Sequence, residues 1–583
     1  MPTKQNYKQG ILRRIHEHLS LIYADVDVVI STDEIAEEMY DVMGLGATQS
    51  TAEPYVNKWH QGDAVLITYG DSILSPSSNP LHCLRRFLQQ HVQNHFSSVH
   101  ILPFFPYSSD DGFAVIDFSS VNESLGDWED IVDIANDYQL MADLVINHCS
   151  SQGIWFENFK QGRSPGRDYF ICVDPESDLS AVVRPRTSSL LRETETLEGV
   201  KHVWCTFGHD QVDLNFRNPE VLVQIVRLIR LYLDKGVRIF RLDAVAFLWK
   251  QIGTDCLNLE PTHEIIRLLR TLMDFACNDA IIITETNIPN RDNLSYFGNA
   301  NEAHCIYNFS LPPLLLHALV TGQSRFLKQW MMSMPPARNG TAYLNFIASH
   351  DGIGLRPAEG LLMEDDIDAL IGCLRAFGGR VSWRAESGKD RPYEINIALF
   401  DACRGTIHGE DQWRDARYIL AHTIMLSLEG IPAIYIHSLL ATPNDTDRAD
   451  STGNNRAINR HKWNEEKLND LLSQQSTPQF KTLLAIKNLL ERRSQQPAFH
   501  PNATQFTLHL GEKIFGFWRQ SSDRLQSIFC IFNMTRETQE FHLGSINLIE
   551  TDNWYDILSG EPLKNISEVL SLAPYQGFWI SNR

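Results

Sequence analysis

Residues 218–243 constrain the fold more strongly than any other stretch of this chain. Asn218 is a good helix cap, and Pro219 suits the first helical position. Apolar residues then recur at helical spacing, Gly236 ends the helix, and a short apolar strand runs to Asp243. Because strand-like runs alternate with amphipathic helices along much of the chain, the pattern predicts parallel β/α units.

Three carboxylates stand where such strands end. Asp243 ends Val-Arg-Ile-Phe-Arg-Leu-Asp, Glu285 ends Ile-Ile-Ile-Thr-Glu, and Asp351 follows Leu-Asn-Phe-Ile-Ala-Ser-His. The carboxyl ends of the strands of a parallel barrel meet at one face, and the active sites of such barrels lie there. A nucleophile and an acid/base residue at that face are what glycosyl transfer with retention needs.

The neighbours of two of these acids indicate their protonation. Arg241 and Asp243 share one face of a strand, because side chains alternate, and the cation favours an ionised carboxylate. Glu285 follows three isoleucines, and burial there would raise its pKa, as a general acid requires. The plainer interpretations are an internal ion pair that positions a loop and a capped loop.

A chain of 583 residues is too long for one ordinary core. We predict an α/β fold, a TIM-type (β/α)8 barrel over residues 61–496 with a helical extension over 1–60 before it. Short alternating apolar runs predict a C-terminal antiparallel β-domain over 497–583. Polar inserts interrupt the barrel pattern at 149–206 and 352–412, and inserts at the mouth of a barrel usually build the substrate pocket.

Composition narrows the classes of partner. The net charge is −21 with the acids spread along the chain, which argues against nucleic acid and anionic membranes as partners. No stretch resembles a signal peptide or reaches transmembrane length. The ten cysteines are scattered without a Cys-x-x-Cys pair, which favours free thiols. We therefore expect a cytoplasmic monomer or homodimer that acts on small molecules.

Four short segments follow one another along the chain: Asp143-Leu-Val-Ile-Asn-His148, Arg241-Leu-Asp243, Glu285 and His350-Asp351. They resemble the four marker regions of glycoside hydrolase family 13, the α-amylase superfamily. Further segments between about 100 and 461 are similar to sucrose phosphorylase and its relatives: Leu102-Pro-Phe-Phe, Asp110-Asp-Gly-Phe113, Arg184-Pro-Arg186, Leu311-Pro-Pro-Leu-Leu-Leu-His-Ala-Leu319, His350-Asp-Gly-Ile-Gly354 and Ile458-Asn-Arg-His461. The helical extension is not part of that pattern.

The resemblance implies three catalytic roles. Asp243 would be the nucleophile that forms a β-glucosyl-enzyme ester, and Arg241 would orient it. Glu285 would protonate the leaving oxygen and then deprotonate the incoming acceptor. Asp351 would hold sugar hydroxyls and support the oxocarbenium-like transition state.

The resemblance also implies a pocket for one sugar. His148 and His350 would bind hydroxyls of the reacting glucose, and Phe113 would form a stacking wall. Asp110 and Arg460 would close the far end, so that a single terminal glucosyl unit is transferred.

The resemblance implies phosphorolysis, with inorganic phosphate as co-substrate. An acidic protein would need fixed cations to bind that phosphate. Arg184 and Arg186 lie in the first insert, and arginine matches phosphate oxygens in a bidentate manner. By resemblance Arg184 is the better phosphate ligand, and the plainer interpretation is a solvated turn. No cofactor is expected, and the resemblance implies no metal, calcium at Asn147 included.

The leaving group is indicated by departures from the sucrose phosphorylase pattern. The second insert has Arg391-Pro-Tyr393-Glu394 where sucrose enzymes resemble Asp-Leu-Tyr-Gln, and Arg356 adds a cation near the mouth. Thr286-Asn287 replaces Val-His after the acid. These features resemble glucosylglycerate phosphorylases and imply a substrate carboxylate. Sucrose, sucrose 6′-phosphate and glucosylglycerol remain alternative donors, and a hydrolase or transglucosylase and a non-catalytic relative remain alternative functions.

Overall fold

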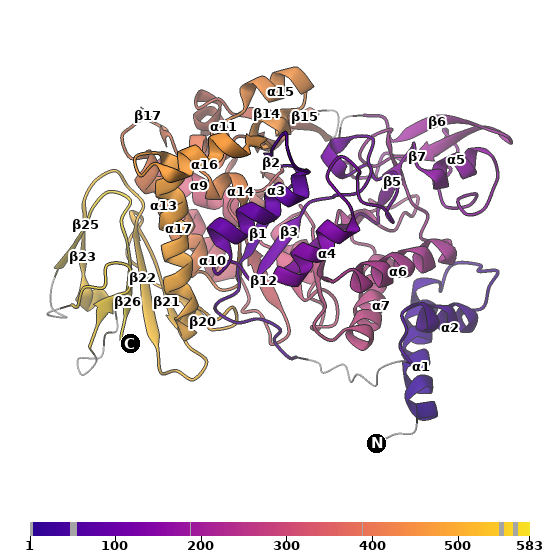
Figure 1. The fold of residues 1–583 in the computed structure, drawn as a ribbon, viewed down its shortest axis with the longest axis horizontal. Coiled ribbons are helices and arrows are strands. Elements are labelled where there is room, and N and C mark those ends of the chain that lie inside the picture. Colours follow the sequence, from indigo (N-terminus) through magenta and orange to yellow (C-terminus); the bar gives the residue numbers. More distant parts are fainter. Residues whose placement is uncertain are drawn as a thin grey trace.

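The computed structural model describes residues 4–46, 55–186, 188–386, 389–546, 548, 553–563 and 569–583 (Figure 1). Residues 47–54 of the predicted extension, residues 187, 387 and 388 of the two inserts, and short stretches of the C-terminal domain between 547 and 568 lie outside the described residues.

Eight parallel strands form a closed barrel in the order β1-β18-β12-β11-β10-β9-β4-β3. They are β1 (Val65–Thr68), β3 (Ser98–Ile101), β4 (Gln139–Leu144), β9 (Val237–Leu242), β10 (Ile281–Thr284), β11 (Cys305–Tyr307), β12 (Ala342–Asn345) and β18 (Ile431–Tyr435). The predicted TIM-type barrel is thereby confirmed.

Helices surround the barrel (Figure 1). The longer ones are α3 (Pro80–Phe87), α4 (Trp128–Asp137), α6 (Pro219–Asp234), α7 (Glu260–Ala276), α9 (Leu311–Thr321), α10 (Arg325–Ser333), α13 (Arg414–Ser427) and α17 (Pro478–Ser494). The α6–β9 unit follows the prediction from the sequence. Asn218 Oδ1 accepts from the Glu220 amide at 3.0 Å, and Gly236 adopts φ +90° between helix and strand. A Cβ on Gly236 would meet the Ala135 Cβ at 2.9 Å, so glycine suits this tight connection.

Two predicted strand ends differ from the structure. β4 ends at Leu144, so Asp143 lies inside the strand and His148 begins the separate strand β5 (His148–Ser150). β12 ends at Asn345, and an irregular segment carries the chain from there to Asp351. The apolar runs continue past both strand ends because residues 145, 146, 346 and 347 are buried without belonging to the barrel sheet.

The N-terminal extension is a helix pair, α1 (Lys4–Ile22) and α2 (Thr32–Val42), packed on the outside of the barrel beside α6 and α7 (Figure 1). Ile11, Ile15 and Leu19 are buried, as their spacing predicts. His18 Nδ1 lies 2.5 Å from a carboxylate oxygen of Glu264 on α7. The extension therefore packs on the outside of the barrel against α6 and α7.

Both inserts leave the barrel at the mouth. The first contains β5, α5 (Ile154–Lys160), the hairpin β6 (Leu191–Thr196) and β7 (Gly199–Trp204), and β8 (Gln211–Asp213). The second contains β13 (Ile353–Gly354), the short helix η4 (Arg356–Ala358), α11 (Glu364–Ala376), and the paired strands β14 (Arg380–Glu386) and β15 (Lys389–Asn396). β13 pairs with β15, so this insert is a small sheet.

An antiparallel sheet ends the chain, in the order β20 (Thr504–Thr507), β21 (Ile514–Gln520), β22 (Ser527–Asn533), β26 (Gly577–Ser581) and β24 (Tyr555–Asp556). It lies at the opposite end of the molecule from α1 and α2 (Figure 1). The ten cysteines are free thiols. Among the described residues, no helix is long and apolar enough to cross a membrane.

Candidate active site

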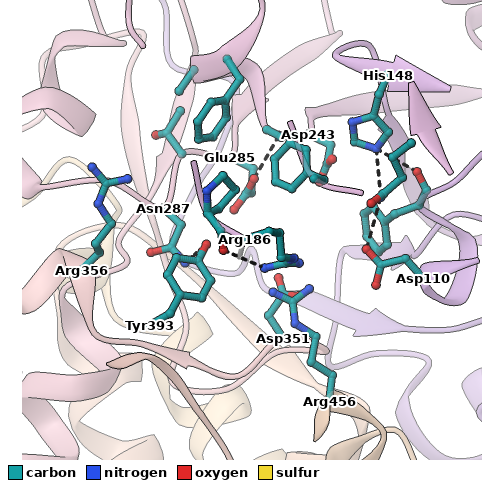
Figure 2. A pocket seen from close by; sticks show the side chains of 18 of the residues that line it. Asp110, His148, Arg186, Asp243, Glu285, Asn287, Asp351, Arg356, Tyr393 and Arg456 are labelled. Carbon is teal, nitrogen blue, oxygen red and sulfur yellow. Dashed lines mark hydrogen bonds and ion pairs between the residues drawn. The ribbon is translucent and has the colours of Figure 1, made fainter. Parts of the chain in front are cut away.

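A cavity opens at the mouth of the barrel, and all three predicted acids line it. Figure 2 shows Asp110 and His148 at one end and Arg356, Asn287 and Tyr393 at the other, with the acids between them. The lining residues are Asp110, Phe113, His148, Pro185, Arg186, Phe207, Gln211, Asp243, Ala244, Ala246, Phe247, Glu285, Thr286, Asn287, His350, Asp351, Arg356, Tyr393 and Arg456.

Arg241 fixes the position of Asp243. Its side chain is buried in the barrel interior, where Nη1 donates to Asp243 Oδ1 at 2.6 Å and to Asp143 Oδ1 at 2.5 Å. Asp143 in turn lies 2.7 Å from His100 Nε2. This buried chain of charges keeps the Asp243 carboxylate in one orientation, with its other oxygen available to a substrate.

Glu285 stands beside Asp243 on the cavity wall (Figure 2). The residue after Asp243, Ala244, adopts φ +49°, and its amide donates to Glu285 Oε2 at 3.0 Å. Arg241 Nη2 is 3.9 Å from the same oxygen. Burial raises the pKa of Glu285, and it raises the pKa of Asp243 to about 8 against the opposing effect of Arg241. The expectation that Arg241 alone keeps Asp243 ionised is therefore wrong, because burial outweighs the cation. The two adjacent buried carboxyl groups therefore share a proton near neutral pH, so that one is an acid while the other is an ionised carboxylate.

We predict that Asp243→Asn stabilises the fold, and more so at alkaline pH. The raised pKa means that the folded protein binds a proton which the unfolded chain has lost, between the ordinary pKa of aspartate and about 8. Stability therefore falls as pH rises through this window, and asparagine removes that loss. The variant should melt at a higher temperature than the wild type, and its free energy of unfolding should be larger by roughly 0.5–2 kcal/mol. The difference in stability between variant and wild type should be larger at about pH 9 than at about pH 5. An equal difference at both pH values would contradict the raised pKa of Asp243.

Asp351 is held by arginines that follow the second insert. Arg456 Nη1 lies 2.6 Å from Asp351 Oδ1, and Arg460 Nη2 lies 3.8 Å from the same oxygen. Burial favours the neutral acid, but Arg456, His350 and Arg460 outweigh it and hold the pKa of Asp351 well below its ordinary value. Asp351 is therefore ionised throughout the physiological range.

The predicted sugar-binding residues gather at the other end of the cavity. The Phe113 ring stacks on the His350 ring at 5.1 Å between centroids, and His148 Nε2 lies 3.0 Å from the Phe113 carbonyl oxygen. Gln211, which the sequence reasoning missed, donates to Asp110 Oδ2 at 3.3 Å. The sequence could have indicated it, because polar and apolar residues alternate in Gln211-Val-Asp213, shortly after the predicted end of the first insert.

The far wall of the pocket corrects one prediction. Arg460 does not line the cavity. It pairs with Asp111 at 2.5 Å and donates to the His350 carbonyl at 2.9 Å. Arg456 lines the cavity instead, because the 3₁₀ helix η5 (Asn455–Asn459) turns the two side chains in different directions. The segment Arg456-Ala-Ile-Asn-Arg460 contains two arginines and so indicated two candidates for the pocket wall. Only Arg460 was predicted to lie there.

The end of the cavity near Arg356 differs from a second prediction. Tyr393 lines the cavity within 3.5 Å of Asn287 Nδ2, but Glu394 is buried behind it and forms a bidentate pair with Arg456 at 2.8 and 3.0 Å. A β-bulge explains the difference. Ser382 on β14 pairs with Glu394 and Trp383 pairs with Pro392, so Tyr393 is the extra residue and is not held in the regular pairing. Arg356 on η4 reaches the cavity as predicted and is nearly buried.

The two predicted phosphate ligands are also separated. Arg186 lines the cavity, with its guanidinium 5.9 Å from the ring centroids of both Phe207 and Tyr393. Arg184 lies outside the cavity lining and donates to the Arg186 carbonyl at 3.3 Å. The chain bends at Pro185, so these side chains do not share a face. Of the two arginines, only Arg186 lines the cavity, whereas the sequence favoured Arg184.

The side chain of Asn147 is bound by a lysine of the same chain, Lys250. Lys250 Nζ donates to Asn147 Oδ1 at 2.7 Å and lies 2.6 Å from Asp213 Oδ2. The ammonium group ties the end of the barrel strand region to β8 and compensates the buried Asp213 carboxylate.

Comparison with known proteins agrees with this geometry. The family model for the catalytic domain of alpha amylase matches residues 93–352. With the closed barrel and its three acids, the match defines a catalytic barrel of the α-amylase type. Glucosylglycerate phosphorylase of Allomeiothermus silvanus is 42% identical over 524 residues, covering 90% of this chain and 91% of that protein. Glucosylglycerate phosphorylase of Spirochaeta thermophila is 37% identical over 579 residues, covering 97% and 98%. The chain belongs to this phosphorylase family within the α-amylase superfamily.

The predicted family and the phosphorylase class of enzyme are thus confirmed. The Spirochaeta thermophila match spans enough of the chain to include most of the N-terminal extension. A crystal structure of sucrose 6F-phosphate phosphorylase from Thermoanaerobacter thermosaccharolyticum has a TM-score of 0.71 at 24% identity, covering 88% of this chain and 98% of the other. That likeness supports the fold alone.

Proposed function

We propose that this protein transfers the glucosyl group of 2-O-(α-D-glucopyranosyl)-D-glycerate to inorganic phosphate, releasing D-glycerate and α-D-glucose 1-phosphate. One observation carries this proposal. Arg186 and Arg356 line the same cavity as the three acids in a protein of net charge −21. Two fixed guanidinium groups suit two anionic partners, the glycerate carboxylate and phosphate. The two relatives are both named as phosphorylases of glucosylglycerate, which supports this substrate.

In the first step, an oxygen of Asp243 attacks C1 of the glucosyl group. The bond from C1 to the glycerate oxygen breaks, and Glu285 gives its proton to that oxygen. The product is a β-glucosyl ester on Asp243 with the configuration at C1 inverted. Asp351 stabilises the positive charge that develops on the ring, and Arg241 holds Asp243 in line.

In the second step, a phosphate oxygen attacks C1 from the face that glycerate left. The ester bond breaks and returns its electrons to Asp243, while Glu285 accepts a proton from the acceptor where one must be removed. The second inversion restores the α configuration, as double displacement requires. Phosphate is the co-substrate, and the proposed reaction needs no other cofactor.

The direct test of the proposal is the product of the forward reaction. With 2-O-(α-D-glucopyranosyl)-D-glycerate and phosphate, the enzyme should release glucose 1-phosphate and D-glycerate in equal amounts. Free glucose as the main product at saturating phosphate would instead indicate a hydrolase on the same barrel.

Arg186→Ala should weaken phosphate binding in particular. The loss of a charge-assisted contact predicts an increase of about 10- to 100-fold in the KM for phosphate. Arg184→Ala is the matched control, since it removes the same charge two residues away and outside the cavity lining, and it should change that KM by about threefold or less. Initial rates at varied phosphate measure both, and equal increases for the two variants would remove Arg186 from the phosphate site.

We also propose the cytoplasm as the compartment of this enzyme. All ten cysteines are free thiols, and disulfides are rare in cytosolic proteins.

A further inference from the structure

Arg456 joins two carboxylates that serve different parts of the proposed reaction. Its side chain is only 14% exposed. Nε and Nη2 donate to the two oxygens of Glu394 at 2.8 and 3.0 Å, and Nη1 lies 2.6 Å from Asp351. A bidentate pair fixes the plane of the guanidinium group. Glu394 therefore determines the direction in which Arg456 meets Asp351.

Glu394 belongs to the sheet that carries the proposed acceptor-binding residues. Tyr393 precedes it on β15 and faces the cavity. Gly354 on β13 pairs with Glu394, and the chain continues from there directly to Arg356 on η4. The ion pair with Arg456 thus ties β15 to η5, which packs directly against β14 and β15.

Among the described residues, the shortest ion-pair contact of Asp351 is the one with Arg456. His350 Nε2 lies 3.5 Å from Asp351 Oδ2 and Arg460 lies 3.8 Å from Oδ1. Asp351 itself follows an irregular segment rather than a strand, so the barrel sheet does not fix its side chain directly. Its orientation therefore depends mainly on the guanidinium group of Arg456.

We propose that Arg456 is a positioning residue that holds Asp351 in its productive orientation, and that Glu394 acts through Arg456 to set this orientation. The inference rests on the proposed function, because it gives Asp351 the role of stabilising the glucosyl transition state. The inference adds that the guanidinium group of Arg456 connects the sheet that carries Tyr393 to Asp351 at the glucosyl site. Glu394, which does not line the cavity, would thereby affect the rate of reaction at C1.

The test uses fluoride release from α-D-glucosyl fluoride, which reports glucosyl transfer to Asp243 without depending on the identity of the natural leaving group. Arg456→Met should lower kcat by about 100-fold with the KM for the fluoride within about threefold, because a misplaced group costs transition-state rather than ground-state binding. Arg456→Lys keeps the charge but loses the fork, and should lower kcat by about tenfold. Glu394→Gln should have an effect of similar size to that of Arg456→Lys.

A double variant separates positioning from stability. Arg456→Met leaves the buried carboxylate of Glu394 without its partner, which lowers the melting temperature. Adding Glu394→Gln removes that stranded charge, so the melting temperature should recover while kcat stays as low as in Arg456→Met alone. Arg380→Met is the control. Arg380 on β14 pairs with Asp450 at 2.6 Å and bridges the same sheet to the segment just before η5, away from the cavity.

Recovery of wild-type kcat by the double variant would overturn the proposal, because Arg456 would then serve only to neutralise Glu394. A loss in Arg380→Met equal to that in Arg456→Met would also overturn it, since any bridge to the sheet would then suffice. Failure of the proposed function would look different. The wild type would release fluoride but form no glucose 1-phosphate from phosphate, and the order of the variants in fluoride release would still test Arg456.

Discussion

Replacing Asp243 with asparagine is expected to lower kcat by at least about 10⁴-fold on every glucosyl donor, because the variant has no nucleophile for C1. The change leaves side-chain volume nearly unaltered, and the amide can still accept from Arg241. Circular dichroism and melting curves should therefore show a folded protein. The kinetic loss should be the same on 2-O-glucosylglycerate and on α-D-glucosyl fluoride, since both donors need the same attack.

Glu285→Gln provides the contrast that separates the two acids. Fluoride leaves without protonation, so this variant should retain much of its activity on α-D-glucosyl fluoride. On 2-O-glucosylglycerate, whose leaving oxygen needs a proton, it should lose about 10²- to 10⁴-fold. If Asp243→Asn kept its activity on the fluoride while Glu285→Gln lost it, the proposed roles of the two residues would have to be exchanged.

Replacing Arg356 with alanine is expected to produce the largest change in specificity. In the synthetic direction, with glucose 1-phosphate as donor, kcat/KM for D-glycerate should fall by about 30- to 1,000-fold, the cost of removing one partner of a buried charge pair. With glycerol, which lacks the carboxylate, the same variant should lose about threefold or less. Phosphate release measured with each acceptor in turn gives both values.

Arg391→Ala is the matched control for this experiment. Arg391 lies in the same insert, but its side chain is 53% exposed and pairs with Glu364 at 3.4 Å outside the active-site cavity. Its removal should affect both acceptors equally and weakly. Equal losses for glycerate and glycerol in Arg356→Ala would show that Arg356 supports the cavity wall without binding the acceptor carboxylate.

The fold could be predicted from the sequence because its signals are local. The Asn218 cap, the Gly236 stop and the following apolar strand specify one β/α unit, and the structure contains that unit as expected. Strand ends were harder to place. Buried apolar residues follow β4 and β12 in the chain, and burial alone does not tell a strand from the buried segment that leaves it.

The sequence predicts those site residues whose position follows directly from the end of a strand. It does not predict side chains whose direction depends on an irregular backbone. Asp243 and Glu285 follow directly from strand ends. Glu394 and Tyr393 are predicted to act together, but a β-bulge at Tyr393 separates them, and only Tyr393 lines the cavity. Whether Arg456 or Arg460 reaches the cavity depends on the turn of a short 3₁₀ helix, and their spacing in the sequence does not determine it.

Reverse phosphorolysis tests the central claim most directly. Incubate the wild-type enzyme with glucose 1-phosphate and, separately, D-glycerate, glycerol, fructose, fructose 6-phosphate or water alone, and measure phosphate release. The proposed function predicts rapid release with D-glycerate and release close to that of water with the others. Equal or faster release with a neutral acceptor would contradict the assignment of an arginine-lined acceptor site, and release no faster with any acceptor than with water would contradict phosphorolysis itself.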